Sequence, residues 1–345
     1  MRVDVLIVGQ GLAGSLLARR LDGRASLAVV DPGEGNASRV AAGLMTPLTG
    51  RRFSLTPEYP SLLARAAESL GALGVFRPCD VYRMFADAEQ RAAGLRRADC
   101  RTCAPFIRSL ASGPGELDAE LDDPHGGALM RGAWADLPRL LDETAAWLGG
   151  RLIRDRVVAG EITEDQGGVA WKGLRAGTVV WCDGWRASLP GGVFADLAWQ
   201  PAKGEALDLV SDAPLQDRIL NREGWALCLG GGRWRTGTNW AWEDLGESPT
   251  AAQADKLLRR FAGFFRRPVS AEVTRHLAGT RPGTRDNRPF LGRHPARARP
   301  WLLNGLGPRG TVWAPSAVDW LAASLLEGAP IPAAYSLARE PGARA

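Results

Sequence analysis

The sequence predicts an α/β fold, in which a discontinuous Rossmann-like nucleotide-binding domain carries a second domain built on an antiparallel β-sheet. A strand-helix-strand pattern with a glycine-rich turn occupies residues 3–31, and further parallel α/β elements recur around residues 137–182 and after residue 302. Short strands separated by glycine-rich turns fill residues 201–242. Strands that alternate with helices are typical of a helix-covered parallel sheet, whereas consecutive strands and turns are typical of an antiparallel sheet.

The N-terminal segment predicts a βαβ unit. The β-branched run at residues 3–8 is typical of a buried parallel strand, and Gly9-Gln10-Gly11-Leu12-Ala13-Gly14 follows it directly. Leucines then recur at helical spacing up to Gly23. A second apolar strand at residues 27–30 ends at Asp31. The glycine-rich turn therefore lies between a strand and a helix, where a dinucleotide-binding turn belongs.

Each feature of this turn has a physical role in binding a dinucleotide. Gly9 permits the tight turn, Gly11 lets the backbone approach the pyrophosphate, and Gly14 allows close packing of the helix on the strand. The helix N-terminus offers free N–H groups and partial positive charge to the phosphates. Asp31 is placed to accept hydrogen bonds from the adenosine ribose. A glycine-punctuated turn of some other α/β protein is the competing interpretation, and these residues alone leave NAD and FAD both open.

The remaining elements extend this α/β pattern. Amphipathic spacing predicts helices over residues 62–73, 137–148, 250–265 and 315–326, and an apolar strand over residues 178–182. Thr250 is a plausible N-cap, and Pro315 fits the first turn of the last helix. We therefore assign residues 1–75, 130–195 and 278–345 to the nucleotide-binding domain, and residues 76–129 and 196–277 to the antiparallel domain.

Composition and charge favour an ordinary globular protein. The chain has 345 residues, of which 45% are hydrophobic and 23% are charged, with a formal net charge of +5. The arginines are scattered in pairs rather than gathered in a stripe, so a nucleic-acid partner is not expected. No secretory signal and no run of 18 apolar residues is present, so we expect a cytoplasmic protein without a membrane segment. The oligomeric state stays open.

The cysteines do not predict a metal site. The five cysteines include one C-x-x-C pair, Cys100 and Cys103, but no second pair or nearby histidine completes a zinc site. We therefore assign no metal to the chain and, from the sequence, no redox role to the pair.

Three further segments carry motifs. Ala37-Ser38-Arg39-Val40-Ala41-Ala42-Gly43-Leu44 is rich in small residues, and Pro201-Ala202-Lys203-Gly204-Glu205 opens the antiparallel region. The third, Gly279-Thr280-Arg281-Pro282-Gly283-Thr284-Arg285-Asp286-Asn287-Arg288-Pro289-Phe290-Leu291-Gly292, closely matches G-x-R-P-x-T-x-D-x-x-P-x-I-G. Gly305, Gly310 and Ala314-Pro315 follow before the final helix. With the N-terminal turn, these segments resemble the D-amino-acid oxidase superfamily, and especially its glycine oxidase-like branch, over most of the chain.

This resemblance implies FAD as the cofactor, so that the discontinuous domain is the FAD-binding domain and the antiparallel domain is the substrate domain. The implied FAD-binding residues are Gly9, Gly11, Leu12, Ala13, Gly14, Asp31, Ser38, Ala42, Gly43, Val157, Gly184, Gly305, Gly310 and Thr311. Gly279 and Thr280 stand where sarcosine-oxidase-like members carry a cysteine that attaches FAD. We therefore expect FAD to be bound non-covalently.

The resemblance also implies the reaction. The family oxidises a C–N bond of a small amine or amino acid by hydride transfer to the flavin N5 atom, the imine product is hydrolysed, and oxygen or another acceptor takes the electrons. Arg281 occupies the position of the arginine that grips the substrate carboxylate, and a structural pair with Asp286 is the alternative. Five tryptophans of the substrate domain line either a pocket or the core. A tRNA-modifying flavoprotein, resembling the oxidase half of the carboxymethylaminomethyl-uridine enzyme, and a non-catalytic flavin-binding protein are the competing functions.

Overall fold

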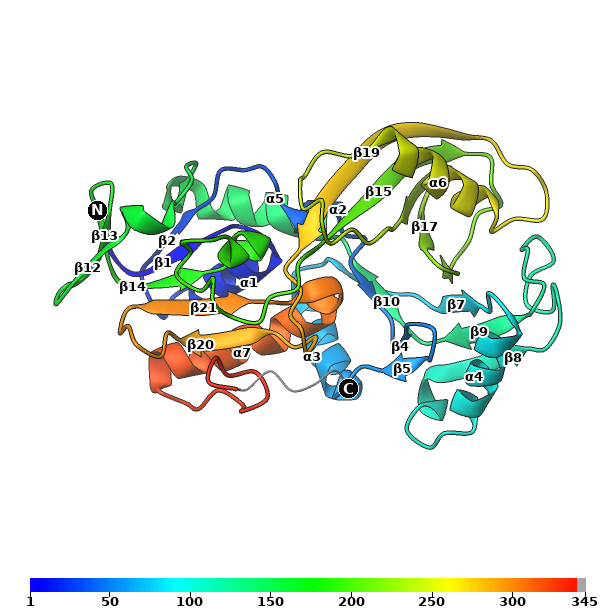
Figure 1. Ribbon diagram of the computed structural model, residues 1–345, viewed down its shortest axis with the longest axis horizontal. Coiled ribbons are helices and arrows are strands. Elements are labelled where there is room, and N and C mark those ends of the chain that lie inside the picture. Colours follow the sequence, from blue (N-terminus) through cyan, green and yellow to red (C-terminus); the bar gives the residue numbers. More distant parts are fainter. Residues whose placement is uncertain (340–345) are drawn as a thin grey trace.

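The computed structural model describes residues 1–339. Among these residues, the first strand, β1 (Arg2–Val8), lies in the middle of an eight-stranded sheet (Figure 1). Its strands are β1 (Arg2–Val8), β2 (Leu27–Val30), β11 (Leu152–Ile153), β12 (Thr163–Asp165), β13 (Gly168–Trp171), β14 (Leu174–Trp181), β20 (Phe290–Arg293) and β21 (Pro300–Asn304). Strands β11, β2, β1, β14 and β21 run parallel in that order. Hairpin β12–β13 and strand β20 add antiparallel edges.

Helices cover one face of this sheet because their leucine-rich sides need burial. They are α1 (Leu12–Leu21), α3 (Tyr59–Ala72), α5 (Leu137–Leu148) and α7 (Gly310–Glu327). Leu17, Leu21 and Leu141 are fully buried in one apolar cluster with side chains of β1 and β2. The other face carries a second cluster, in which Trp171 and Phe194 cover the sheet from hairpin β12–β13 and from the loop after β14.

The second large sheet forms the other half of the molecule in Figure 1. Its order is β19 (Ala271–Arg281), β15 (Ala202–Ser211), β18 (Arg233–Gly237), β17 (Trp225–Gly230), β16 (Ile219–Asn221), β7 (Val81–Met84), β9 (Gly127–Met130) and β8 (Ile107–Ala111). All neighbouring pairs are antiparallel except β16 with β7, which are parallel. Helix α6 (Ala251–Ala262) packs Phe261 against Trp234, with 5.3 Å between the ring centroids.

Small elements join the two sheets. Helix α2 (Ala37–Val40) lies beside β19, and a three-stranded sheet pairs β3 (Leu44–Met45), β10 (Ala133–Ala135) and β6 (Phe76–Pro78). A two-stranded hairpin consists of β4 (Leu48–Thr49) and β5 (Ser54–Leu55), and α4 (Ala88–Ala98) lies on the outer side of β9. We propose the chain division predicted above as the domain boundaries, and β19 spans the one at residues 277–278.

The predicted α/β class and both kinds of sheet are confirmed, and one local prediction is wrong. Helix α7 begins at Gly310, so Pro315 lies inside the helix rather than in its first turn. Gly310 resembles a helix breaker in the sequence, whereas its backbone is helical in the fold. Thr250 is the N-cap of α6, as predicted, and its hydroxyl donates to Glu205 Oε1 at 3.2 Å.

Candidate active site

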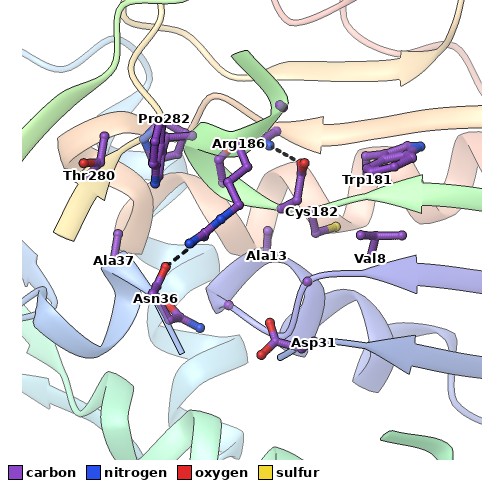
Figure 2. Close-up of a pocket in the computed structure, with 18 of the residues that line it drawn as sticks. Val8, Ala13, Asp31, Asn36, Ala37, Trp181, Cys182, Arg186, Thr280 and Pro282 are labelled. Atoms are coloured by element: carbon purple, nitrogen blue, oxygen red, sulfur yellow. Dashed lines mark hydrogen bonds between the residues drawn. The ribbon is translucent and has the colours of Figure 1, made fainter. Parts of the chain in front are cut away.

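A cavity of about 580 Å³ opens at the carboxyl ends of the parallel strands, where it reaches the end of β19. Most lining residues come from segments 8–13, 30–38, 155–160, 181–194, 280–282 and 304–311, and Ala41 and Leu137 complete the lining. Figure 2 shows Asp31, Asn36 and Ala37 on one side of this space, with Arg186, Thr280 and Pro282 on the other. Ligands of open α/β sheets bind at this edge, outside the carboxyl ends of the strands.

The glycine-rich turn brings β1 and α1 close enough to form the floor of the cavity. A Cβ on Gly14 would overlap the carbonyl oxygen of Gly9, so only glycine permits this approach. Helix α1 begins at Leu12, whose amide donates to the Ser38 hydroxyl at 3.0 Å. The positive end of a helix dipole therefore lies in the cavity, where it favours a bound anion. The turn fits the diphosphate of a dinucleotide.

Asp31 is held rigidly at the end of β2. Its Oδ2 accepts from the Gln10 amide at 2.6 Å and its Oδ1 accepts from the Gly33 amide at 2.7 Å. The residue is only 7% exposed, yet it lines the cavity. A carboxylate fixed by two backbone amides keeps further lone pairs for a ligand. This geometry suits a ribose with two hydroxyls.

The structure brings most of the predicted site residues into this one cavity. Those that line it are Gly9, Gly11, Leu12, Ala13, Asp31, Ser38, Val157, Gly184, Arg281, Gly310 and Thr311. Those outside the lining are Gly14, Ala42, Gly43 and Gly305. Ala42 packs in an apolar cluster, and the Gly43 carbonyl accepts from the Ala135 amide at 3.0 Å. The small-residue segment thus reaches the cavity through Ala37, Ser38 and Ala41.

Several cavity residues were missed by the sequence reasoning. Asp183 follows β14, accepts from Asn304 Nδ2 at 3.2 Å, and has its pKa raised to about 7 by burial. Asn36 caps α2 by accepting from the Ser38 amide at 2.9 Å. Asp183 was detectable, because polar residues directly after buried parallel strands meet at one edge of a sheet. Asn36 carried no such signal.

Arg281 lies at the end of β19 and lines the cavity. Its Nη2 donates to Thr238 Oγ1 at 2.6 Å and its Nη1 to the Asn239 carbonyl at 3.4 Å. Its Cζ lies 4.5 Å from the centroid of the Trp240 ring. Within residues 1–339 it forms no salt bridge, and burial lowers its pKa to about 10. A desolvated cation of this kind attracts an anionic ligand.

Two observations bear on the role predicted for Arg281. Asp286, the alternative partner, instead pairs with Arg339, whose Nε lies 2.8 Å from Asp286 Oδ2. A Cβ on Gly204 would overlap the guanidinium, so β15 must carry glycine there to make room for it. The guanidinium thus lies between the backbone of β15 and the ring of Trp240. There it lines the cavity instead of pairing with a carboxylate of the described residues.

Residues 238–250, here called the strap, connect the second sheet to the cavity wall. On the sheet side, Lys203 Nζ lies 2.6 Å from Asp244 Oδ2, and the Thr280 hydroxyl donates to the Leu245 carbonyl at 2.8 Å. On the cavity side, Arg186 Nη2 lies 2.8 Å from Glu247 Oε1. Arg186 also donates to the Gly35 carbonyl at 3.2 Å. The strap therefore ties the sheet that carries Arg281 to two cavity-lining segments.

The tryptophans of the second sheet and the strap differ in burial, and Trp240 and Trp242 lie outside the cavity lining. Trp234 is fully buried in the core beneath α6, whereas Trp240 and Trp242 of the strap are 46% and 55% exposed and stack on each other. Trp240 is the one of these that contacts Arg281.

The described residues contain no group of three or more histidine, cysteine, aspartate or glutamate side chains able to hold a metal ion. In the same part of the chain, no helix is long and apolar enough to cross a membrane.

This chain is similar to known proteins both in sequence and in structure. The family model described as FAD dependent oxidoreductase matches residues 4–324. Glycine oxidase from Pseudomonas putida is 26% identical over 97% of this chain and 98% of that protein. The structure of glycine oxidase from Geobacillus kaustophilus has a TM-score of 0.84 at 23% identity and covers 99% of this chain and 100% of that one. Iminodiacetate oxidase from Chelativorans sp. BNC1 has a TM-score of 0.74 at 21% identity, over 96% and 98% of the two chains.

Proposed function

Because this chain belongs to the FAD dependent oxidoreductase family, with FAD as its cofactor, we propose that it oxidises a C–N bond of a small amine that carries a carboxylate, such as an amino acid. One observation carries this proposal: the guanidinium of Arg281, without a salt bridge in residues 1–339, lines the same cavity as the dinucleotide-binding turn. A substrate gripped there lies within the space that also holds the cofactor.

The cavity residues fit FAD. The N-terminus of α1 supplies amides for the diphosphate, and Asp31 supplies acceptors for the ribose. When bound, FAD would supply the two-electron oxidation of the carbon next to the substrate nitrogen, which gives an imine that water hydrolyses. Cys182 lines the cavity, but burial raises its pKa well above the ordinary value, so its thiol stays protonated. We propose that FAD is held non-covalently.

Arg281 positions the substrate rather than exchanging protons with it. A guanidinium offers two parallel N–H groups that match the two oxygens of a carboxylate. Arg281 lies at the end of β19 with its guanidinium over the ring of Trp240. This position restricts the orientation of the guanidinium–carboxylate pair. A carboxylate held in this way fixes the neighbouring carbon and nitrogen relative to the cofactor, which lowers the entropic part of the barrier.

A substrate panel tests the proposal. The purified FAD-loaded protein is mixed without oxygen with glycine, sarcosine, iminodiacetate, a set of D-amino acids, L-amino acids, or bulk tRNA, and the visible band of the oxidised flavin is followed. Bleaching by one of the amino acids is expected. Bleaching by tRNA alone indicates an RNA-modifying enzyme, and a flavin that no member of the panel bleaches argues against the proposed substrate class.

Asp31→Ala is expected to weaken FAD binding without abolishing it. Each hydrogen bond to a charged group contributes about 1.5–3 kcal/mol, which corresponds to a rise in Kd of roughly 10- to 150-fold. Asp31→Asn should lose less, since its amide oxygen still accepts one bond. The Kd is measured by quenching of flavin fluorescence as apoprotein is added. If Asp31→Ala binds FAD as tightly as the parent protein, the ribose is not at Asp31.

Glu247→Gln is expected to speed FAD dissociation several-fold. The Arg186–Glu247 pair fastens the strap to cavity-lining residues, and both side chains are only about one quarter exposed, so the pair is not fully screened by solvent. Dissociation is followed as flavin fluorescence after dilution. Glu243→Gln is the matched control, because Glu243 lies on the same strap, is exposed and pairs with no described residue. Equal rates for the two variants would show that the strap does not retain FAD.

A further inference from the structure

The Cys100-Arg101-Thr102-Cys103 segment forms a tight turn directly after α4. The Cys103 and Ala104 amides donate to the Cys100 carbonyl at 2.9 Å and 2.8 Å, which curls the backbone. Both sulfur atoms then approach one hydroxyl, since Thr102 Oγ1 lies 3.3 Å from Cys100 Sγ and 3.9 Å from Cys103 Sγ. The fold therefore gathers the two thiols at one point, away from the lining of the FAD cavity.

The two thiols differ in environment. Cys103 is 2% exposed, in an apolar cluster with Val81 and Phe85, and burial raises its pKa. Cys100 is half-buried at the edge of this cluster. Hydrogen bonds from the Thr102 hydroxyl and amide, and then from the Cys103 thiol and amide, lower the pKa of Cys100 to about 6. Cys100 is thus a partly accessible thiolate beside a buried thiol, which is the arrangement of a nucleophile and its resolving partner.

Metal binding does not account for this pair. A structural zinc site needs four ligands, and no third histidine, cysteine or carboxylate joins the two thiols among residues 1–339. Two neighbouring thiols without a metal can still be oxidised to a disulfide and reduced again. This role is not predicted from the sequence, since the spacing of two cysteines does not show which thiol is hydrogen-bonded or buried.

We propose that Cys100 and Cys103 form a redox-active dithiol, a modification site separate from the FAD cavity, which hydrogen peroxide converts to an intramolecular disulfide. The Cys100 thiolate attacks one peroxide oxygen, the O–O bond breaks, and the other oxygen takes up a proton and leaves as water. The resulting sulfenic acid at Cys100 is attacked by the Cys103 sulfur, which loses its proton, and the sulfenic oxygen leaves as a second water. Two thiols lose two electrons, and one peroxide is reduced to two waters.

Peptide mapping tests this directly because Arg101 separates the two cysteines. The native full-length protein is treated with added peroxide, alkylated, unfolded and digested with trypsin, which cleaves after Arg97, Arg101 and Arg108. We expect peptides 98–101 and 102–108 to appear joined by a disulfide after peroxide, and separate and alkylated after a reductant. Because the peroxide is added, this outcome does not depend on the substrate proposed above.

Single variants identify the order of events. Cys103→Ser should stop at the sulfenic acid of Cys100, captured by a sulfenic-acid-specific reagent, and Cys100→Ser should give neither product. Alkylation of Cys100 in the native protein should have its midpoint near pH 6, rather than near the ordinary value of about 8.5. Cys228, which is half-buried and lies in β17, is the matched control. If peroxide oxidises Cys228 before any joined peptide forms, or if the Cys100 midpoint lies at the ordinary value, the proposal is overturned.

Discussion

Gly11→Val is expected to yield a folded protein that contains no FAD. Gly11 is the N-cap of α1 and lines the cavity, and a Cβ there points toward Ser38 Oγ at 3.4 Å. The further methyl groups of valine then occupy the space that the diphosphate needs beside the helix N-terminus. The effect is complete exclusion rather than a weaker contact, because the cavity floor is backbone and does not move aside.

Acid-released FAD per polypeptide, measured with a thermal melt, checks this result. Gly71→Val is the matched control, since Gly71 lies exposed in α3 with nothing within 4 Å of its would-be Cβ. The control should keep its FAD and melt at or slightly above the temperature of the parent protein, because valine has a higher helix propensity than glycine. A Gly11→Val protein with normal FAD content would show that the cofactor lies elsewhere.

Arg281→Met is expected to lower kcat/KM by roughly 10- to 150-fold, which corresponds to the loss of a charge-assisted pair of about 1.5–3 kcal/mol. Most of the change should appear in KM if the pair is equally strong in the ground state and the transition state. Fold and FAD content should stay intact, because the partners of Arg281 among residues 1–339 are one hydroxyl and two backbone carbonyl groups. Arg281→Lys should recover only part of the activity, because an ammonium group carries the charge but cannot form the two-pronged contact.

Arg285→Met is the matched control for this substitution. Arg285 belongs to the same sequence motif but is exposed and forms no salt bridge with a described residue. Steady-state kinetics of both variants with the amino acid that bleaches the flavin separate a substrate contact from a general loss of positive charge. An Arg281→Met protein that melts early and loses FAD would mean that Arg281 supports the fold rather than the substrate.

Local patterns brought together the glycine-rich turn and Asp31, which both line the cavity, because these residues are close in sequence. The turn at residues 9–14 and Asp31 belong to one βαβ unit, whose geometry fixes their positions. The apolar spacing of residues 137–148 likewise predicted α5 with the bounds that the structure has. In these places, periodicity and turn chemistry act over fewer than two dozen residues, so the sequence alone determines the local fold.

Long-range contacts were beyond the reach of the same reasoning. The Arg186–Glu247 pair joins the segment after β14 to the strap, and the surroundings of Arg281 come from β15, β19 and the strap. No spacing in the sequence shows that Asp286 pairs with Arg339 and leaves Arg281 to the cavity. The resemblance to a family singled out Arg281, which lines the cavity. It did not single out Trp240, because only the fold shows that Trp240 contacts Arg281 while Trp234 is buried in the core.

If one cavity holds both FAD and a carboxylate bound by Arg281, a carboxylate without a C–N bond should bind beside the flavin without being oxidised there. Glycolate is titrated into the FAD-loaded parent protein and into Arg281→Met, and the flavin absorption spectrum is recorded. We expect a saturable spectral shift in the parent protein and a glycolate affinity at least about 10-fold weaker in Arg281→Met. An equal shift at equal glycolate concentration in both proteins would show that Arg281 does not bind the carboxylate.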